Sequence, residues 1–191
     1  MNLPFIADKT FTNQDFTSTP LQKAEYDNCI FDNCNFSEAF LASFSFLECE
    51  FNDCNLSLVK IKEATFKDVD FNDCKMVGFP LQECNTLLLS VSFNDCDSQL
   101  ALFNGLSLKH TLFNNCNLTK MDFTETNLTQ AVFENCNMEQ AKFEASNLEK
   151  ANFETAYNFN IDPNHNRLKG AKFSKNNLEG LLKNHQLVIS E

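Results

Sequence analysis

The feature that most constrains this chain is a large apolar residue at every fifth position. The frame begins at Phe11, slips by two residues near 86–93, resumes at Phe93 and continues to Phe153. An amphipathic helix buries residues three or four apart, and a half-buried strand buries alternate residues. A period of five fits neither pattern. It predicts a chain that turns after each short segment, with one turn geometry repeated along its length.

A second period of 20 residues sorts the large residues into four columns. One column is Phe throughout, and we expect its rings to stack in the core: Phe11, Phe31, Phe51, Phe71, Phe93, Phe113, Phe133 and Phe153. In a neighbouring column Tyr26, Phe46 and Phe66 are followed by Thr86. We expect Thr86, Ser98 and the segment 78–80 to weaken the core around the slip.

The position two residues before each large residue is small or medium, and all nine cysteines occupy it. Six of them form one column: Cys34, Cys54, Cys74, Cys96, Cys116 and Cys136. The alternative interpretation is a metal or disulfide ladder. No His accompanies the column, however, and an apolar wall raises the pKa of a thiol. We predict buried free thiols that fill space beside the Phe rings.

The repeated unit is a small residue, a polar residue, Leu or Phe, and two polar residues, as in Cys116-Asn117-Leu118 and the two residues that follow. This unit resembles that of the pentapeptide-repeat family over about Phe11 to Phe153, with a weaker tail to Leu178. The resemblance implies an all-β fold, a right-handed quadrilateral β-helix with four repeats in each of about 7–8 coils and a short C-terminal helix. The large and small positions then face inward.

Three segments follow from where the pattern holds: an N-terminal cap over 1–10, the β-helix over 11–158, and a C-terminal segment over 159–191. In the last, Asn176 resembles a helix start and 187–189 resembles a short strand. Because solenoid ends must be covered, this segment either caps the rod or pairs two rods. Its candidate dimer residues are apolar: Leu178, Leu181, Leu182, Leu187 and Ile189.

The charge is acidic and uneven. The net charge is −11, and residues 1–100 hold 16 acidic and 6 basic residues while residues 101–191 hold 10 and 9. Such a surface repels nucleic acid and anionic lipid, so we expect neither direct nucleic-acid binding nor membrane association. The first ten residues lack the features of a signal peptide, and no apolar run is long enough to span a bilayer. We therefore expect a cytoplasmic protein.

One column concentrates this charge. Asp53, Asp73 and Asp95 recur at the same position beside the Phe column, and three more acidic residues accompany them: Glu50, Asp70 and Asp97. Like charges about 5 Å apart repel, although water and salt weaken the effect. A row of this kind compares with the phosphates of a DNA strand. We predict that these residues form a partner-binding face; the alternative is that the acidity serves only solubility.

Catalytic signals are not evident in the sequence. His110, His165 and His185 are scattered and have no paired carboxylates at a useful spacing. There is no phosphate-binding Gly-rich loop, dinucleotide turn or metal-ligand motif. The prediction is a non-enzymatic binding protein with no cofactor and no metal site.

Within the pentapeptide-repeat family, the chain is similar to Qnr-type quinolone-resistance proteins and their loopless mycobacterial relatives. The grounds are its length, uninterrupted repeats, acidity and Leu-rich C-terminal segment. The resemblance implies a head-to-head homodimer joined through that segment. It also implies a rod that mimics DNA, binds DNA gyrase or topoisomerase IV, and inhibits the enzyme or protects it from quinolones.

The sequence also departs from that pattern. Qnr proteins carry two larger lateral loops, one of which the family needs for drug protection, whereas the interruption here is two residues long. The alternative function is a structural scaffold for an unrelated partner.

Overall fold

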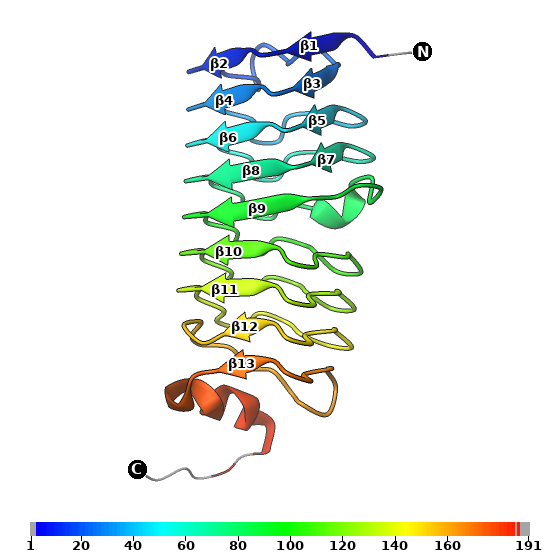
Figure 1. Cartoon of the computed structure of the whole chain (residues 1–191). Coiled ribbons are helices and arrows are strands. Elements are labelled where there is room, and N and C mark those ends of the chain that lie inside the picture. Colours follow the sequence, from blue (N-terminus) through cyan, green and yellow to red (C-terminus); the bar gives the residue numbers. More distant parts are fainter. Residues whose placement is uncertain (1–2, 186, 188–191) are drawn as a thin grey trace.

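The chain forms a rod of stacked coils (Figure 1). The structure is a computed structural model and describes residues 3–185 and 187. Short parallel strands form a four-stranded and a nine-stranded sheet, which lie side by side along the rod. The four-stranded sheet contains β1 (Phe5–Ala7), β3 (Glu25–Asp27), β5 (Ser45–Leu47) and β7 (Thr65–Lys67). The nine-stranded sheet contains β2 (Thr10–Thr12), β4 (Ile30–Asp32), β6 (Glu50–Asn52), β8 (Val69–Asn72), β9 (Val91–Asn94), β10 (Leu112–Asn114), β11 (Val132–Glu134), β12 (Asn152–Phe153) and β13 (Lys172–Phe173).

Neighbouring strands in each sheet come from equivalent positions of successive coils. Phe31 is opposite Phe51 in the β4–β6 pair, and Phe113 is opposite Phe133 in the β10–β11 pair. The other two sides of each coil are linked by single parallel bridges, such as that between Asn117 and Asn137. The all-parallel solenoid confirms the predicted quadrilateral β-helix. Adjacent coils are about 4.8 Å apart, so nine strands make one side about 38 Å tall.

The corners of the coils explain why so few glycines suffice. At most corners the residue two positions after the large residue has a positive φ, for example Asn33 (48°), Asp53 (50°) and Gln130 (59°). Asn and Asp tolerate this conformation better than other non-glycine residues. The corner amide also donates a hydrogen bond to the next coil, as Asn33 N does to Asn52 O at 2.9 Å. This bond recurs at successive coils and stabilises the strained corner.

The Phe column runs the length of the rod. Ring centroids in successive coils are 4.8–5.4 Å apart and the ring planes lie within 20° of each other, from Phe11 to Phe173. Its rings are buried except those of the end members, Phe11 and Phe173, which are half-buried. Burying one such side chain contributes about 1.5–3 kcal/mol, and each stacked pair adds about 0.5–1.5 kcal/mol.

The cysteine column lies beside the Phe column. All nine cysteines are buried free thiols. In the six-membered column each Sγ donates to the carbonyl oxygen of a Phe in the preceding coil, for example Cys74 Sγ to Phe51 O at 3.2 Å. Burial raises the pKa of the Cys34 thiol and, in a second column, that of Cys49 to about 12. Cys34 and Cys49 therefore act as small, protonated core residues.

The two-residue slip is accommodated on the side that carries the four-stranded sheet. Asn85 still pairs with Thr65, but Thr86 is exposed, so its expected place in the core is wrong. Leu89 packs against the core instead. On the neighbouring side, the strand register resumes at once, because Val91 is opposite Val69 in the β8–β9 pair.

The segment before the slip also differs from expectation. Phe79 was expected to weaken the core, but it is fully buried and packs edge-on against Phe66 and Phe71 at 6.3 and 5.8 Å. Ser98 is buried as well. A short 3-10 helix, η1 (Leu81–Glu83), replaces the usual corner there. A large side chain thus occupies a small-residue position in the core beside the irregular turn.

The coil pattern extends beyond 11–158 at both ends. Phe5–Ala7 forms β1 and pairs with β3, although 1–10 was expected to be a cap. At the other end, Phe173 in β13 stacks on Phe153 at 5.1 Å. Two 3-10 helices follow, η2 (Lys175–Leu181) and η3 (Lys183–His185), and they lie across the last coil (Figure 1).

Helix η2 is fastened to the rod by side-chain hydrogen bonds. It begins after Ser174, whose hydroxyl accepts a hydrogen bond from Asn176 N at 3.2 Å, so Asn176 is not its N-cap. Asn177 Nδ2 donates to the carbonyl oxygens of Phe153 and Ala156 at 3.2 and 2.9 Å. These bonds satisfy two carbonyl groups of the last coils, which no further coil covers.

Candidate partner-binding surface

The first part of the candidate surface is a column of three aspartates at one corner. Asp53, Asp73 and Asp95 all have positive φ and exposed side chains. Their amides donate to carbonyl oxygens of the next coil at 3.0, 2.9 and 2.8 Å, which sets the coil-to-coil register. The backbone therefore holds three carboxylates in a row at a separation of about 4.8 Å.

The second part lies on the nine-stranded sheet itself. Glu50 in β6 is directly opposite Asp70 in β8, and both are exposed. Ser92 in β9 donates a hydrogen bond from its hydroxyl to Asp70 Oδ1. Five of the six expected residues thus lie on one side of three successive coils.

Asp97 is separated from the other five. It follows the corner at Asp95 and lies on the next side of the rod, paired with Lys75 and with Asn117. Its carboxylate accepts hydrogen bonds from Gln99 Nε2 at 2.9 Å and from Asn117 Nδ2 at 3.2 Å. With these partners Asp97 is less free than Asp53 or Asp73 to contact another molecule.

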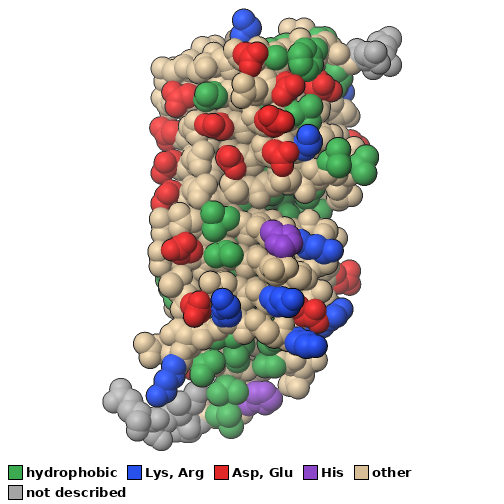
Figure 2. Space-filling view, viewed as in Figure 1, with side chains coloured by type: hydrophobic (Ala, Val, Ile, Leu, Met, Phe, Trp, Pro, Cys, Tyr) green, Lys and Arg blue, Asp and Glu red, His purple; other side chains and the backbone are tan. Residues whose placement is uncertain are grey.

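Two acidic residues of this surface were missed by sequence reasoning. Glu48 and Asp68 occupy the corner where the two sheets meet, in the same coils as Glu50 and Asp70, and both are exposed. The signal was present, because each is an acidic residue two positions before another. The acidic residues of this face gather towards the N-terminal coils and basic residues gather towards the C-terminal coils (Figure 2).

A shallow depression adjoins the acidic surface. It is lined by Asp68, Asp70, Ser90 and Ser92, together with His110 from the coil beyond the slip. The inserted residues before β9 make this the most irregular part of the face. Sequence reasoning treated His110 as isolated because the carboxylates that share its depression lie some 40 residues earlier in the chain.

The expected dimer residues have unlike surroundings. Leu178 and Leu187 are exposed, at 42% and 59%. Leu182 is half-buried, and Leu181 packs against the core of its own rod. Leu187 is not in a strand, and Ile189 lies outside the described residues. Among the described residues, Leu178, Leu182 and Leu187 are thus available for a shared apolar seam, whereas Leu181 contributes to the core of its own rod.

The described residues contain neither a cluster of metal ligands nor a membrane-spanning helix. No three His, Cys, Asp or Glu side chains there are arranged to hold a metal ion. Over the same part of the chain, no helix has the length and apolarity needed to cross a membrane.

Several known proteins are similar to this chain. A trypsin-treated variant of QnrB1, a plasmid-mediated fluoroquinolone resistance protein, matches at TM-score 0.61 and 14% identity, covering 100% of both chains. Full-length QnrB1 matches at TM-score 0.42 and 17% identity, covering 96% of this chain and 100% of its own. HetL, a pentapeptide repeat protein involved in heterocyst differentiation regulation from the cyanobacterium Nostoc sp. strain PCC 7120, matches at TM-score 0.39 and 16% identity, covering 91% and 87%.

The family assignment comes from the sequence profile, since identities this low show the fold alone. No curated protein matches the chain. The profile described as "Pentapeptide repeat region" matches residues 21–103, 44–121 and 106–182. These ranges cover most of the coils in which the structure shows the repeat, and the chain belongs to the pentapeptide repeat family.

Proposed function

We propose that this protein is a non-enzymatic, cytoplasmic DNA mimic that binds a type II topoisomerase, either DNA gyrase or topoisomerase IV. The observation that carries the proposal is the aspartate column at Asp53, Asp73 and Asp95 beside Glu50 and Asp70. The column repeats a negative charge about every 4.8 Å, and one DNA strand repeats a phosphate every 3.4 Å or so. A groove of Lys and Arg that binds DNA attracts such a row.

The rigidity of the rod supports the same partner. The carboxylates are attached to corners whose amides are bonded to the next coil, so little order is lost when a partner binds. The likeness in fold to QnrB1, described as a fluoroquinolone resistance protein, is consistent with a target of that drug class.

We further propose that two rods join head to head through the C-terminal segment. Leu178 and Leu187 expose apolar surface, and Leu187 lines a small hollow together with Glu179, Leu182 and Lys183. Exposed apolar groups of this kind are a common feature of protein contacts. Such a dimer doubles the length of the rod and presents one acidic surface on each side of the seam.

The topoisomerase proposal is tested by a gyrase supercoiling assay, titrated with this protein, with and without ciprofloxacin. The wild-type protein should change supercoiling or drug-stabilised cleavage, and the effect should weaken as salt rises. The triple variant Asp53→Asn, Asp73→Asn, Asp95→Asn keeps residues that tolerate positive φ and should lose most of the effect.

A control variant removes the same amount of charge elsewhere on the rod: Glu63→Gln, Glu125→Gln and Glu139→Gln. It should behave like the wild type. If the two triple variants are equally active, the aspartate column is not the contact surface. If the wild-type protein leaves gyrase and topoisomerase IV unaffected at every concentration, the proposed partner is wrong, and a scaffold for an unrelated partner becomes the better function.

The dimer is tested separately by sedimentation of the variant Leu178→Asp with Leu187→Asp. These two side chains are exposed, so their replacement leaves the cap folded, whereas Leu181 contributes to the core. Loss of the head-to-head contact is expected. The control Leu87→Asp introduces a charge at another exposed leucine and should not alter the mass. An unchanged mass for the double variant would rule this seam out.

A further inference from the structure

An apolar strip crosses the side of the rod opposite the nine-stranded sheet. Four large side chains are exposed on it: Phe40 at 79%, Leu58 at 50%, Leu100 at 51% and Leu102 at 38%. Gly78 and Pro80 lie between them. We call these six residues the apolar strip. Most outward positions in this family of coils are polar, so a run of apolar residues over four coils indicates a contact surface.

The strip is an ordered column and not a chance grouping. Leu58 N donates to Val77 O at 3.1 Å, Gly78 N to Gln99 O at 2.8 Å, and Leu100 N to Thr119 O at 3.0 Å. Each corner residue is thereby placed directly above the corner of the preceding coil. The column reads, in order along the rod, Glu38, Leu58, Gly78, Leu100 and Lys120.

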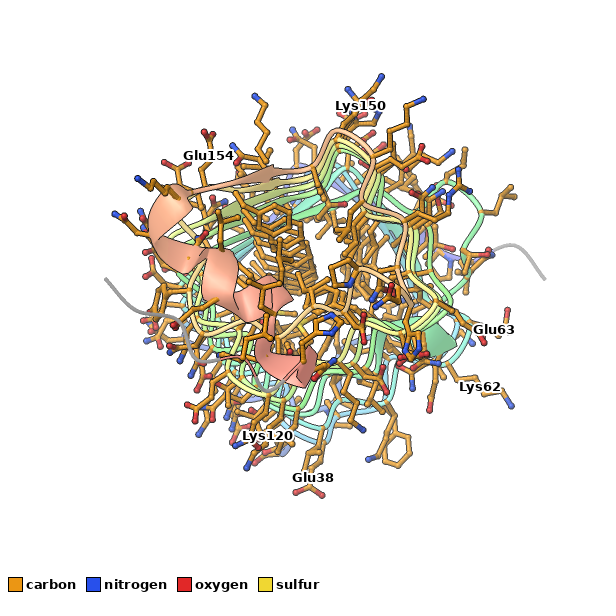
Figure 3. All side chains as sticks on the ribbon, turned by 90° about the horizontal axis from the view of Figure 1, so that it is seen from below. Glu38, Lys62, Glu63, Lys120, Lys150 and Glu154 are labelled. Atoms are coloured by element: carbon orange, nitrogen blue, oxygen red, sulfur yellow. The ribbon has the colours of Figure 1, made fainter. Side chains whose placement is uncertain are left out.

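This column is antisymmetric about its centre. Leu58 and Leu100 lie one coil on either side of Gly78, at about 4.8 Å, and Glu38 and Lys120 lie two coils away with opposite charges. Seen along the rod, Glu38 and Lys120 share one edge of the cross-section, and Lys150 and Glu154 lie on the opposite edge (Figure 3). Both Glu38 and Lys120 are exposed.

The centre of the strip is low and smooth. Gly78 has no side chain, and a Cβ there would lie 2.8 Å from Leu58 Cδ2, so the Leu58 side chain covers it. Pro80 is beside it in the adjacent column and has no amide proton that needs a partner. Two such surfaces can approach closely at this point.

We propose that a second copy of this chain packs on the apolar strip, antiparallel to the first, about a two-fold axis at the level of Gly78. The axis places each column against the same column of the other copy, in reversed order. Leu58 of each copy then meets Leu100 of the other, and Glu38 of each copy meets Lys120 of the other. An isologous contact of this kind forms the Glu38–Lys120 ion pair twice, once at each end, without any further surface.

The neighbouring column is subject to the same operation, which places Phe40 against Asp122 across the contact as well as Lys60 against Leu102. It reads Phe40, Lys60, Pro80, Leu102 and Asp122, with bridges from Phe40 to Lys60 and from Leu102 to Asp122. Reversal about Pro80 places the methylene stem of Lys60 over Leu102 of the other copy. The Lys60 ammonium group then lies one coil from the other copy's Asp122, within reach of an ion pair.

This arrangement explains why the occupant is a second copy and not another protein. An unrelated partner has no reason to require opposite charges at equal distances from Gly78, whereas a two-fold axis requires them. The contact is also separate from the proposed head-to-head seam, and it leaves the aspartate column on the outer side of each rod. It therefore does not depend on the proposed topoisomerase partner.

The test is sedimentation equilibrium of the full chain at low salt, over a range of concentrations, with Leu178→Asp and Leu187→Asp present to remove the other seam. This protein should form dimers. Glu38→Lys alone, or Lys120→Glu alone, opposes like charges at both ends of the contact and should give monomers. The double variant Glu38→Lys, Lys120→Glu should regain the dimer.

A mixture gives the sharpest outcome. Equal amounts of the two single variants should form a heterodimer, because the Glu38→Lys copy and the Lys120→Glu copy are complementary at both ends. The control Glu63→Lys, at a different corner, should leave the dimer intact. A monomeric starting protein at all concentrations, single variants that still dimerise, or a mixture that stays monomeric would each overturn the proposal.

Discussion

The rings of Phe113 and Phe133 lie parallel, with planes 4° apart and centroids 4.9 Å apart. Phe113 stacks equally closely on Phe93, at 5.1 Å and 5°. Each interior ring of the column is thus held between two others. Removal of one such ring therefore leaves a cavity between its two neighbours.

The variant Phe113→Ala should therefore lose about 3–5 kcal/mol of unfolding free energy, from lost burial and from the cavity left behind. Urea denaturation followed by circular dichroism measures it. The control Leu87→Ala removes a side chain that is 71% exposed and should change stability by no more than about 0.5 kcal/mol. An unchanged midpoint for Phe113→Ala would show that this ring does not face inward.

The positive φ at the corners predicts that glycine is tolerated there better than a β-branched residue. Gln130 has φ of 59°, an exposed side chain and an amide that donates to Glu149 O at 2.9 Å. Gln130→Gly should be close to neutral, because glycine adopts positive φ without strain. Gln130→Val should lose about 1–2 kcal/mol. Thermal melts of the two variants give the comparison, and equal melting temperatures would contradict the corner geometry.

The free energy of unfolding should fall at alkaline pH because two buried acidic groups, Cys49 and Tyr26, resist ionisation in the fold. Burial raises the pKa of Cys49 from 9.0 to about 12 and that of Tyr26 from 10.0 to about 12. Both groups are neutral in the fold and ionise more readily in the unfolded chain. Their contribution is complete below about pH 9 and is lost as pH rises towards 12.

The measurement is the urea midpoint between pH 8 and pH 10.5, with Cys49→Ala as the comparison. Removing this thiol should reduce the steepness of the decline, although the variant is less stable at pH 8. Parallel pH profiles for the two proteins would show that Cys49 has the same pKa in both states.

The C-terminal cap has one position where any side chain is excluded. A Cβ at Gly180 would overlap the ring of Phe159 and lie 2.8 Å from its carbonyl oxygen. Gly180 O also accepts a hydrogen bond from Ile161 N at 3.0 Å. Gly180→Ala should therefore displace η2 and expose the last coil, which hydrogen exchange of the Ile161 amide would detect. As a comparison, Ser174→Ala removes only the hydroxyl that caps η2 and should have a smaller effect.

The periodic part of this fold was predictable from the sequence because one local rule repeats. The inward position of Phe31 or Phe133 depends only on the phase of the five-residue frame, and each coil supports the next. The cysteine column followed from the same phase, since Cys74 and Cys96 remain in register across the slip. The positions of Asp53, Asp73 and Asp95 in one row also followed from it.

The irregular parts were not predictable, because their placement depends on contacts between coils. Thr86 lies at the five-residue spacing in the sequence and yet is exposed. The coil has two extra residues that must lie outside the core, and the packing of Leu89 against the core determines which residues these are. Phe79 broke the small-residue rule and yet is buried. Ser174 caps η2 in preference to Asn176 because β13 ends there.

The two-residue slip shows that the length of the chain in one coil can change without a change in how the coils stack. Phe71 and Phe93 stack at 5.4 Å and 8° although the chain between them is two residues longer than in other coils. The added length is taken up entirely at the corner around 86–90, where Leu87 and Leu88 are exposed. That corner should therefore tolerate longer insertions. A loop added there, whether by evolution or by design, lengthens one coil and leaves the register between successive coils unchanged.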